Sequence, residues 1–288
     1  MRSLTPVCHF AVAVLLAGCG GNTATTPIFD PTTTVAPWAA GGPFVTIGER
    51  MTYRLSLKGF ELASYTLAVG DIQELDDKQT VIVEGHAKSV GLANIVAKVD
   101  DRFTSWIDTT NGRPRRFQTA EYATGSDTNV EHAIIDFAKR TGDHVPVSFQ
   151  LNDTPATPEP QKVSQADVWD YNAFLVALRA WEAPAGAKIS TEVFRSRYLW
   201  KIDVTVRGKE RLLTELGELP AVRFDGHAVK LTREGTRFPD TDERDFSIWI
   251  SDEGDRVPLK NTAKTDYGDI EMVIVDYAPG TGQYLRPH

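Results

Sequence analysis

Hydrophobic and polar residues alternate along most of this chain. The run Met51-Tyr53-Leu55-Leu57 has polar or charged residues between its apolar members, and similar runs recur at 65–69, 81–83, 103–107, 202–206 and 272–274. Successive side chains of a strand point to opposite faces of a sheet, so this alternation predicts half-buried strands. Turn signals such as Gly70-Asp71 and Asn111-Gly112 separate the runs. The pattern therefore predicts a mainly antiparallel, all-β architecture.

One segment departs from the alternation. Between Ser164 and Trp181 the apolar positions are 168, 171, 174, 175 and 178, which is helical spacing. Ser164 followed by Asp167 resembles an N-cap with an acidic first turn, and Pro184 with Gly186 terminates the pattern. We predict one helix over about 165–181 that connects two β halves, at about 44–150 and 183–288. Its apolar stripe is expected to pack on a sheet.

The two halves also resemble each other. Val81–Ala87 and Val222–Ala228 both end in an acidic residue followed by Gly-His-Ala, and Phe103–Ile107 resembles Phe246–Ile250. The order is the same and the spacing is nearly so. This similarity indicates an internal duplication, with two related β modules that share one core or face each other across a groove.

The N-terminal segment predicts export. Arg2 precedes an apolar run at 10–17, which ends in Leu-Ala-Gly-Cys19. A charge, an apolar core of ~7–15 residues and a small-residue cleavage site indicate a signal peptide, because a membrane span needs ~20 apolar residues. The sequence around Cys19 resembles the lipobox of bacterial lipoproteins, whose cysteine carries a diacylglycerol; the alternative is an ordinary secretion signal followed by a chance cysteine. We expect residues 1–18 to be removed and Cys19 to be the lipid anchor.

Residues 19–43 are expected to be the lipidated cysteine and a flexible tether. This stretch is rich in Thr, Ala, Pro and Gly and has little charge, so it cannot bury enough apolar area to order itself. Gly20 and Gly21 follow the cysteine, with no Asp there, which by resemblance to enterobacterial sorting rules favours the outer membrane, and we expect the protein to face the periplasm. Cys8 would leave with the signal peptide, so the mature domain is expected to hold together without a disulfide.

The composition excludes several classes of partner and site. A net charge of -8 argues against nucleic acid as a partner. Cysteine and histidine spacings typical of zinc sites are missing, and Asp240–Asp245 lacks the glycine and the final glutamate of a calcium loop, so we expect no metal and no cofactor. Nucleophile motifs are also missing. With 39 acidic residues a glycosidase-like carboxylate pair is conceivable, but no pair stands out, and no catalytic residue is assigned.

Four side chains are candidates for ligand binding. His86 and His227 fall at matching positions of the repeat, where they could bind or titrate together; the alternative is that each is a half-buried spacer with a hydrogen-bond partner. Arg195 and Arg197 form a basic row beside Phe194 and Tyr198, and such a row could receive an anionic group. The alternative is a charged outer strand face that keeps the protein soluble.

Three stretches of the chain resemble a family of exported bacterial proteins, domain of unknown function 3108 (DUF3108). They are Gly48–Tyr53, Asp167–Ala180 and Ile248–Pro258, the last being the most specific. The chain departs from the family pattern at Asp170 and Phe174. The resemblance covers nearly all of 44–277. It implies a fold of long curved β-sheets, as a sandwich or half-barrel, and an envelope location, and it implies no reaction.

These features together predict a cell-envelope lipoprotein with a binding or assembly role. A concave β surface, partly closed by the helix, would hold an apolar or amphiphilic ligand such as a lipid or glycan, or dock a partner protein. This expectation rests on analogy with β-sheet lipid carriers. The alternative is a hydrolase or lyase that acts on envelope glycan or lipid through an unidentified carboxylate pair. Two close carboxylates in a deep groove would favour that alternative.

Overall fold

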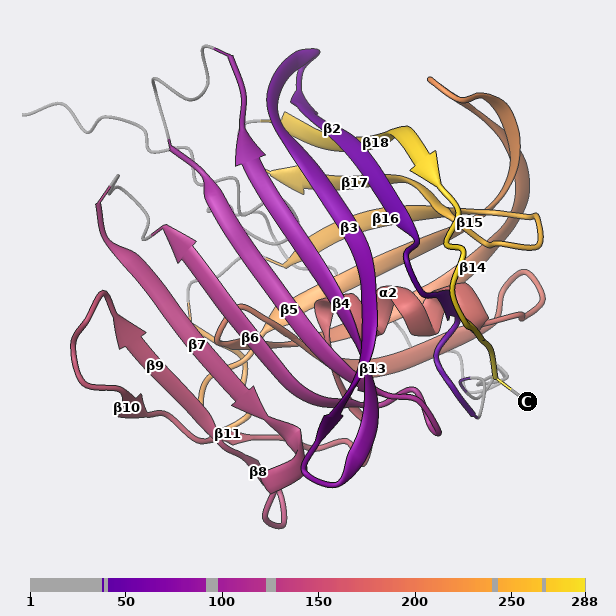
Figure 1. Cartoon of the computed structure of the whole chain (residues 1–288). Coiled ribbons are helices and arrows are strands. Elements are labelled where there is room, and N and C mark those ends of the chain that lie inside the picture. Colours follow the sequence, from indigo (N-terminus) through magenta and orange to yellow (C-terminus); the bar gives the residue numbers. More distant parts are fainter. Residues whose placement is uncertain are drawn as a thin grey trace, which may run out of the picture.

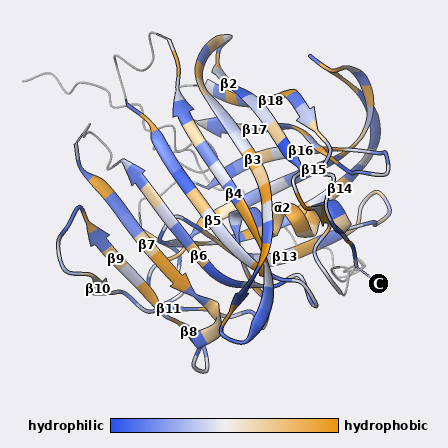
Figure 2. Ribbon diagram, in the orientation of Figure 1, coloured by the Kyte–Doolittle hydropathy of each residue, from blue (hydrophilic) through white to orange (hydrophobic). Residues whose placement is uncertain are grey.

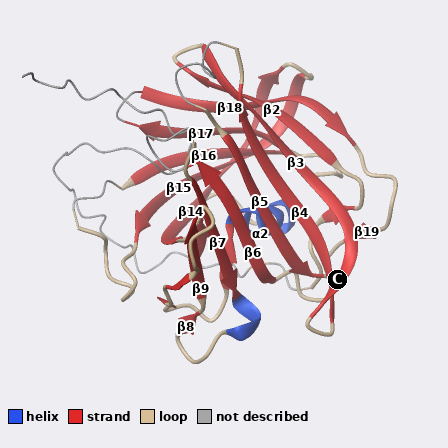
Figure 3. Ribbon diagram, turned by 60° about the vertical axis from the view of Figure 1, so that its left-hand side comes forward, coloured by secondary structure: helices blue, strands red, loops and turns tan. Residues whose placement is uncertain are grey.

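The computed structural model describes residues 38, 41–91, 98–122, 128–239, 243–265 and 268–287. Within them, one fifteen-stranded sheet curves around a single α-helix, α2 (Tyr171–Ala180) (Figures 1 and 3). This arrangement is a half-barrel with its helix inside the curve. The prediction of a mainly β fold with one connecting helix is confirmed.

Two six-stranded meanders make up most of the sheet. The first contains β2 (Arg50–Leu57), β3 (Phe60–Leu75), β4 (Lys78–Ser89), β5 (Asp100–Asp108), β6 (Pro114–Tyr122) and β7 (Val130–Asp136). The second contains β13 (Lys188–Arg195), β14 (Tyr198–Thr214), β15 (Gly217–Lys230), β16 (Arg244–Ser251), β17 (Pro258–Thr265) and β18 (Gly268–Ala278). The first strand of the first half, β2, pairs antiparallel with the last strand of the second, β18.

Short elements extend the two ends of the sheet. The remaining elements are β1 (Val45–Thr46), η1 (Phe137–Lys139), β8 (His144–Val145), β9 (Val147–Leu151), β10 (Thr157–Pro158), β11 (Gln161–Lys162), β12 (Val168–Asp170) and β19 (Tyr284–Leu285). The full order is β10-β9-β7-β6-β5-β4-β3-β2-β18-β17-β16-β15-β14-β13-β12. All neighbours are antiparallel except β12, which pairs parallel with β13. Within the described residues, no strand pairing joins the two ends of this sheet.

The two halves that resemble each other in sequence also pair their strands in the same register. The matching cross-strand pairs are Gly85–Phe103 in the first half and Gly226–Phe246 in the second. The ladder to the following strand shifts its register directly after Trp106 in one half and directly after Trp249 in the other. The two similar β halves are therefore confirmed at the level of individual residue pairs.

Helix α2 begins later than the sequence predicted. Its N-cap is Asp170, whose carboxylate accepts a hydrogen bond from the backbone N–H of Ala173 at 2.9 Å, so the expected N-cap at Ser164 is wrong. The reason is tertiary. Residues 168–170 form a strand against β13, and the backbone N–H of Ser164 donates instead to Glu192 on that strand, at 2.8 Å.

The helix is buried on nearly all of its surface. The apolar residues expected to form its stripe are buried, except for the partly buried Tyr171. Figure 2 shows this hydrophobic helix inside the curve of the sheet. Trp38, which lies in the expected tether, packs its ring against Trp169 and Trp181 at centroid distances of 5.4 and 5.6 Å. Trp38 thus contributes to the packing around α2.

A buried ion pair fixes the C-terminal end of α2. Arg179 donates two hydrogen bonds to Glu49, at 2.6 and 2.9 Å, and both side chains are almost fully buried. Arg179 also donates to the backbone carbonyl of Arg256 at 3.1 Å, while Tyr53 donates to the carbonyl of Pro258 at 2.9 Å. The three stretches that resemble a known family therefore meet at one place, where they position the helix.

In the part of the chain that the structure describes, no helix is both long enough and apolar enough to span a membrane.

Candidate binding site inside the half-barrel

Four polar side chains gather in the apolar interior between α2 and the sheet. They are Tyr65 on β3, Tyr171 and Asn172 at the start of α2, and Asn261 on β17, and we call them the interior polar cluster. Gly85 makes room for part of it. The Tyr65 hydroxyl and the Asn172 amide oxygen both lie within 3.3 Å of the position that a Cβ on Gly85 would take. A glycine is therefore needed here so that the helix and β3 can approach β4.

Several atoms of this cluster are buried without a hydrogen-bond partner in the structure. Asn172 donates from its amide nitrogen to the backbone carbonyls of Val83 and Phe103, at 3.1 and 2.9 Å, which leaves its amide oxygen unpaired. The hydroxyl of Tyr65 is likewise buried and unpaired, and the side-chain amide of Asn261 is buried beside the hydroxyl of Tyr171, to which it can hydrogen-bond. Buried polar groups are nearly always satisfied in folded proteins, so such a concentration marks a place where a polar group of another molecule or a water can bind.

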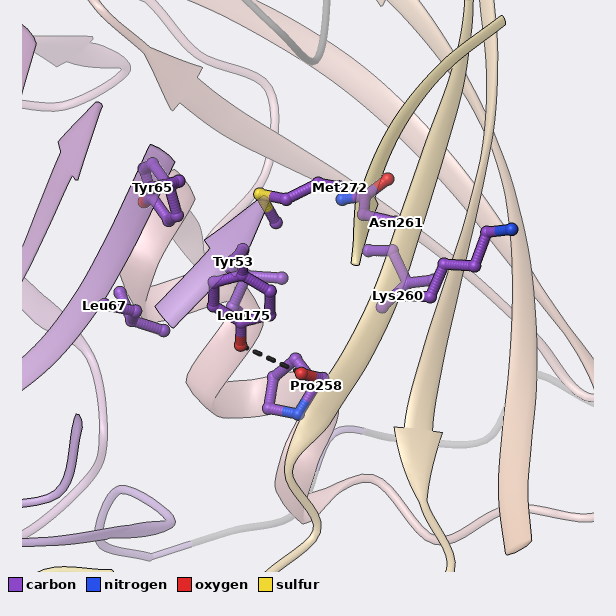
Figure 4. Close-up of a pocket in the computed structure, with 9 residues that line it drawn as sticks. Tyr53, Tyr65, Leu67, Leu175, Pro258, Lys260, Asn261 and Met272 are labelled. Atoms are coloured by element: carbon purple, nitrogen blue, oxygen red, sulfur yellow. Dashed lines mark hydrogen bonds between the residues drawn. The ribbon is translucent and has the colours of Figure 1, made fainter. Parts of the chain in front are cut away.

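A small cavity adjoins the cluster. Tyr53, Tyr65, Leu67, Leu175, Asn261 and Met272 are among its lining residues (Figure 4). It has room for about one water molecule. Figure 4 also shows the Tyr53 hydroxyl bound to the carbonyl of Pro258 below the cavity. Three of these residues are apolar, so the site combines apolar walls with hydrogen-bonding groups at its edge.

Three acidic residues follow one another on the inner face of the first half. Asp101 on β5, Glu121 on β6 and Glu131 on β7 form this acidic row. Glu121 lies directly opposite Glu131. The last register pair between β5 and β6 is Arg102–Ala120, and Asp101 and Glu121 are the next residues of these two strands. Like charges on adjacent strands repel each other, so the row needs compensating cations.

The second half supplies those cations through the β13–β14 hairpin. Arg195 approaches Glu121 at 3.7 Å, and Arg197 approaches Glu131 at 3.8 Å and Glu159 at 3.0 Å. Arg197 also lies over the ring of Phe149 on β9, 3.7 Å from its centroid. Arg233 forms a further ion pair with Glu159. We call this set of ion pairs, together with Asp101, the charged seam.

The predicted basic row is thus paired, in the structure, with carboxylates of the same chain. Arg195 and Arg197 were expected on one face of a strand, but Arg197 lies in the turn between β13 and β14. Both side chains pair with carboxylates of the first half. Sequence reasoning found the arginines and missed the acidic row, because its members are far apart in the chain.

Two carboxyl groups of the interior have displaced pKa values. Burial, and next the charge of Glu121, raise the pKa of Asp101 to about 7, although Arg195 and the N–H of Tyr122 oppose the rise. Burial also raises the pKa of Asp170 to about 7, against hydrogen bonds from Ala173 and Ser105. Burial is likewise the main reason that the pKa of Tyr65 is raised. These groups can therefore remain uncharged near neutral pH.

The two candidate histidines lie elsewhere. His86 on β4 and His227 on β15 project from the outer face, and five strands separate them in the sheet. His86 contacts Asp100 at 2.6 Å, whereas His227 contacts Asp245 at 2.9 Å and Glu243 at 3.1 Å. The structure places them at equivalent positions of the two halves and does not bring them together.

Some predicted features fall, in part or in whole, on residues that the structure does not describe. Cys19 is outside the described residues, and so is part of the acidic segment 240–245. Among the residues that are described, no three His, Cys, Asp or Glu side chains are grouped so as to hold a metal ion. Asn172 is the cluster member that sequence could have signalled, because it is a polar residue next to an apolar helical stripe.

A family model described as protein of unknown function, DUF3108, matches residues 52–275. No curated protein matches the chain. A solved β-barrel-like protein of domain of unknown function DUF1849 from Brucella abortus superposes with a TM-score of 0.52 at 9% identity, covering 82% of this chain and 99% of that one. This likeness shows a shared fold.

Two further solved structures align over similar lengths with lower scores. One is a Bacteroides fragilis protein assigned as exported, with a YmcC-like fold, at a TM-score of 0.36, 8% identity and coverage of 83% of this chain and 99% of that one. The other is a Parabacteroides distasonis protein assigned as a lipoprotein, at a TM-score of 0.36, 8% identity and coverage of 82% and 99%.

Proposed function

Because this chain belongs to the DUF3108 family, whose description names no activity, we propose its function from its own sequence and site. It is a cell-envelope lipoprotein, anchored through Cys19 in the outer membrane and facing the periplasm. Its half-barrel binds an apolar or amphiphilic envelope ligand. Docking of an envelope protein on the same curved sheet is the second form that this role can take.

The observation that carries this proposal is the interior polar cluster beside an apolar cavity. An unsatisfied buried donor or acceptor costs about 1–3 kcal/mol, so several of them within one small region lower the free energy of unfolding substantially. A ligand whose hydrogen-bonding group reaches Tyr65 and Asn261 would remove that cost; the cavity has room for about one water molecule, so only such a small group would enter it. Small-molecule sites combine these features, with mainly apolar walls and a few placed polar groups.

The N-terminal sequence supports the location. Two acyl chains on Cys19 would make anchoring stable. Residues 20–37 would span at most ~60 Å when fully extended, which keeps the domain close to the membrane surface. The contacts of Trp38 with Trp169 and Trp181 mark the point at which the chain joins the folded domain.

Native mass spectrometry of the protein purified from membranes tests both parts of the proposal. We expect a co-purifying mass that matches an envelope lipid or another amphiphile. The Cys19→Ala variant should be soluble in the periplasm, folded, and still able to retain the same ligand. A variant that still sediments with membranes after a high-salt wash would contradict the anchor. Ligand-free protein in both preparations would contradict the binding role.

The acidic row supports the second candidate function, a hydrolase or lyase that acts on envelope glycan or lipid. Asp101, with its pKa at about 7, stands beside Glu121, and a raised carboxyl pKa suits a general acid. Incubation of the protein with envelope extracts should then yield a product that Asp101→Asn and Glu121→Gln abolish. The ion pairs that Glu121 and Glu131 make with arginines favour the binding role.

A further inference from the structure

The hairpin of β14 and β15 extends beyond the strands on either side of it. Strand β13 pairs with β14 no further along than Thr205, and β16 pairs with β15 from Ala221 onward. Residues 207–220 therefore form a two-stranded arm, which we call the β14–β15 arm. Among the described residues, no third strand pairs with it. Figure 1 shows this hairpin curving away at the right of the view.

The matching hairpin of the first half is shorter. Val69 corresponds to Val206 by its backbone hydrogen bond, and Gly85 corresponds to Gly226 by its register. From Val69 to Gly85 the chain advances 16 positions, whereas from Val206 to Gly226 it advances 20. The β14–β15 arm thus contains four residues more than its counterpart, and the duplication alone does not account for its tip.

The arm is fixed against the outer face of the sheet. Near its base, Lys209 contacts Asp252, directly after β16, at 2.6 Å. At its tip, Glu215 forms an ion pair with Arg54. Arg54 lies on the outer face of β2, since its neighbours in the strand are buried on the inner face. The arm therefore crosses the outer side of the sheet from β16 toward β2.

The two faces of the arm differ. Leu212 and Leu219 lie opposite each other and pack, partly buried, against the core. Leu213 is 78% exposed, and Leu216 in the turn is 42% exposed. The turn that presents Leu216 is ordered, because the Thr214 hydroxyl accepts a hydrogen bond from the backbone N–H of Leu216 at 3.1 Å. The arm thus holds two leucines in water at its tip.

These leucines differ from the scattered apolar residues that any protein surface carries. Both fall within four positions at the end of an ordered arm, and the corresponding turn of the first half is Asp76-Asp77. Phe60, which is 76% exposed, lies on the β2–β3 hairpin that the tip contacts through Arg54. Three of the five large hydrophobic side chains exposed in the described chain therefore belong to the tip or to the hairpin beside it.

The base of the arm lies near the point at which the tether joins the domain. Trp38 packs on Trp181 at a centroid distance of 5.6 Å, and Trp181 stacks on Phe224 at 5.8 Å. Phe224 lies opposite Val206, the residue directly before the arm. The chain that leads to the proposed anchor at Cys19 therefore enters the domain beside the arm.

A lipid bilayer is the partner that this arrangement brings to the tip. Residues 20–37 span at most ~60 Å when fully extended, so the tip remains close to the membrane that holds the anchor. Such a tether gives the arm a local concentration of roughly millimolar at that surface. Removing one leucine from water favours docking by about tenfold or more. Two leucines would therefore dock a tethered protein without retaining an untethered one.

The charge of the arm also suits a membrane surface. Its three basic residues, Arg207, Lys209 and Arg211, equal in number its three acidic residues, Glu210, Glu215 and Glu218. The whole chain has a net charge of -8, so most of its surface is repelled by anionic lipid. The arm has no net charge, and it can approach such a surface through its leucines.

We propose that Leu213 and Leu216, at the tip of the β14–β15 arm, dock into the interface of the bilayer that carries the lipid anchor. Docking turns the outer face of the second half toward the membrane. This inference rests on the proposed anchor at Cys19 and adds a second, non-covalent contact with the same membrane.

Docking is tested with a polarity-sensitive dye on the mature chain, residues 19–288, carrying Cys19→Ala. A histidine tag in place of residues 1–18 binds the protein to vesicles of phosphatidylethanolamine, phosphatidylglycerol and a nickel-chelating lipid, so the test needs no natural lipidation. A dye on Glu218→Cys, which lies opposite Leu213, should shift its emission to shorter wavelength on the vesicles. Imidazole, which releases the tag, should reverse the shift.

The first half provides the matched control position. Gln79 is the second residue of β4, as Glu218 is the second residue of β15, and both are exposed. A dye on Gln79→Cys should show no shift, because the shorter hairpin has no leucines at its turn. An equal shift at both positions would mean that the arm has no special contact with the bilayer, and would overturn the inference.

The leucines are tested by a double substitution. Leu213→Ala with Leu216→Ala should abolish the shift, because each truncation lowers the docking equilibrium by about tenfold or more. Both side chains are exposed, so thermal unfolding should be unchanged. The control Ile134→Ala removes a side chain that is 39% exposed on β7 and should leave the shift intact. A shift that survives the double substitution contradicts docking through the leucines.

The remaining outcomes separate this inference from the proposed function. A shift that appears without vesicles as the protein concentration rises would identify a second copy of the chain as the partner and overturn bilayer docking. If the tagged protein shows no shift while protein from cells is acylated at Cys19, the anchor stands and this inference fails. If the tagged protein docks but protein from cells carries no acyl chain, the arm binds bilayers as inferred and the proposed anchor is wrong.

Discussion

The two halves of this molecule meet twice, and the two junctions differ. At the first junction, β18 and β2 pair along their lengths, and Leu57 at the end of β2 lies opposite Ile270. At the second junction, the start of the second half faces the end of the first half without strand pairing. There Arg195, at the end of β13, occupies the place that corresponds to Leu57 and faces Glu121. On the inner face, the first junction is apolar and joined by a backbone ladder, whereas the second carries the ion pairs of Arg195 and Arg197.

The same contrast appears in the interior. Gly226 lies under the ring of Phe246, whose atoms would be 2.0–2.4 Å from an added Cβ, so that space is filled by an aromatic side chain of its own half. At the matching Gly85 the space is taken by the Tyr65 hydroxyl and the Asn172 amide. A duplicated scaffold has therefore kept its backbone register in both halves, while the space beside the matched glycine is filled by polar groups in the first half and by an aromatic ring in the second.

The largest predicted effect concerns a position where the halves differ in charge. The N–H groups of Val69 and Val206 donate to the carbonyls of Glu49 and Ala187 in the same way, at 2.8 and 2.9 Å, so Glu49 corresponds to Ala187. Glu49→Ala gives the first half the residue that the second half has at this position, and it leaves Arg179 buried without its partner. Breaking a buried ion pair in this way should lower the free energy of unfolding by about 3–5 kcal/mol, measured by urea denaturation.

A double variant provides the control. Glu49→Leu combined with Arg179→Met removes both charges and retains apolar volume, so it should recover most of the loss. If Glu49→Ala alone is as stable as the unmodified protein, the ion pair does not hold α2 in place.

The next effect concerns the two matching glycines. Gly85→Ala would bring Cβ to 2.2 Å from the Tyr65 hydroxyl, and Gly226→Ala would meet the Phe246 ring. Overpacking of this kind costs about 1–3 kcal/mol, and we expect thermal unfolding to show a loss for each variant. Tyr65→Phe removes the clashing oxygen and should rescue Gly85→Ala only. Rescue of both variants, or of neither, would show that the two sites do not differ as described.

Sequence reasoning reached the fold because the determining signals are local. Alternation gave the strands, and the Gly-His-Ala and Trp-Ile matches gave the repeat. The helix start was misplaced because Glu192, which is 28 residues away, takes the backbone N–H of Ser164. Strand pairing against β13 then made Asp170 the N-cap. A local capping pattern cannot reveal such a competitor.

The candidate site was much less accessible from sequence. Asn172 reaches Val83 and Phe103, which are 89 and 69 residues away, so no spacing rule links them. The acidic row consists of single carboxylates on three strands, and each resembles any other acidic residue of a surface strand. Only the curvature of the sheet turns them toward Arg195 and Arg197, which the sequence did single out.

A smaller effect should appear in the pH dependence of stability at the charged junction. The pKa of Asp101 is raised to about 7, whereas an unfolded aspartate has a pKa of ~3.9. Folding therefore favours the protonated form. The stability from this group is fully present below pH ~4 and is lost as the pH rises through about 7. Asp170 has its pKa raised in the same direction and adds a similar slope.

Asp101→Asn imitates the protonated carboxyl group at every pH. The variant should be more stable than the unmodified protein at pH 8, by on the order of 1 kcal/mol, and the difference should vanish near pH 4. Denaturant unfolding at a series of pH values measures this. Parallel profiles for the two proteins would mean that Asp101 does not titrate in this range.

The smallest effects are expected where the halves are alike, at His86 and His227. Both side chains lie on the outer face, partly exposed, and each contacts an acidic residue on the same surface. Ion pairs of this kind contribute about 0–1 kcal/mol, so His86→Gln and His227→Gln should each change the free energy of unfolding by less than ~0.5 kcal/mol. Since the sheet itself separates these side chains from the interior, retention of the co-purifying amphiphile should also be unchanged, as native mass spectrometry would show. If either variant keeps its stability but loses the ligand, the ligand binds on the outer face of the sheet, and the interior polar cluster is not the binding site.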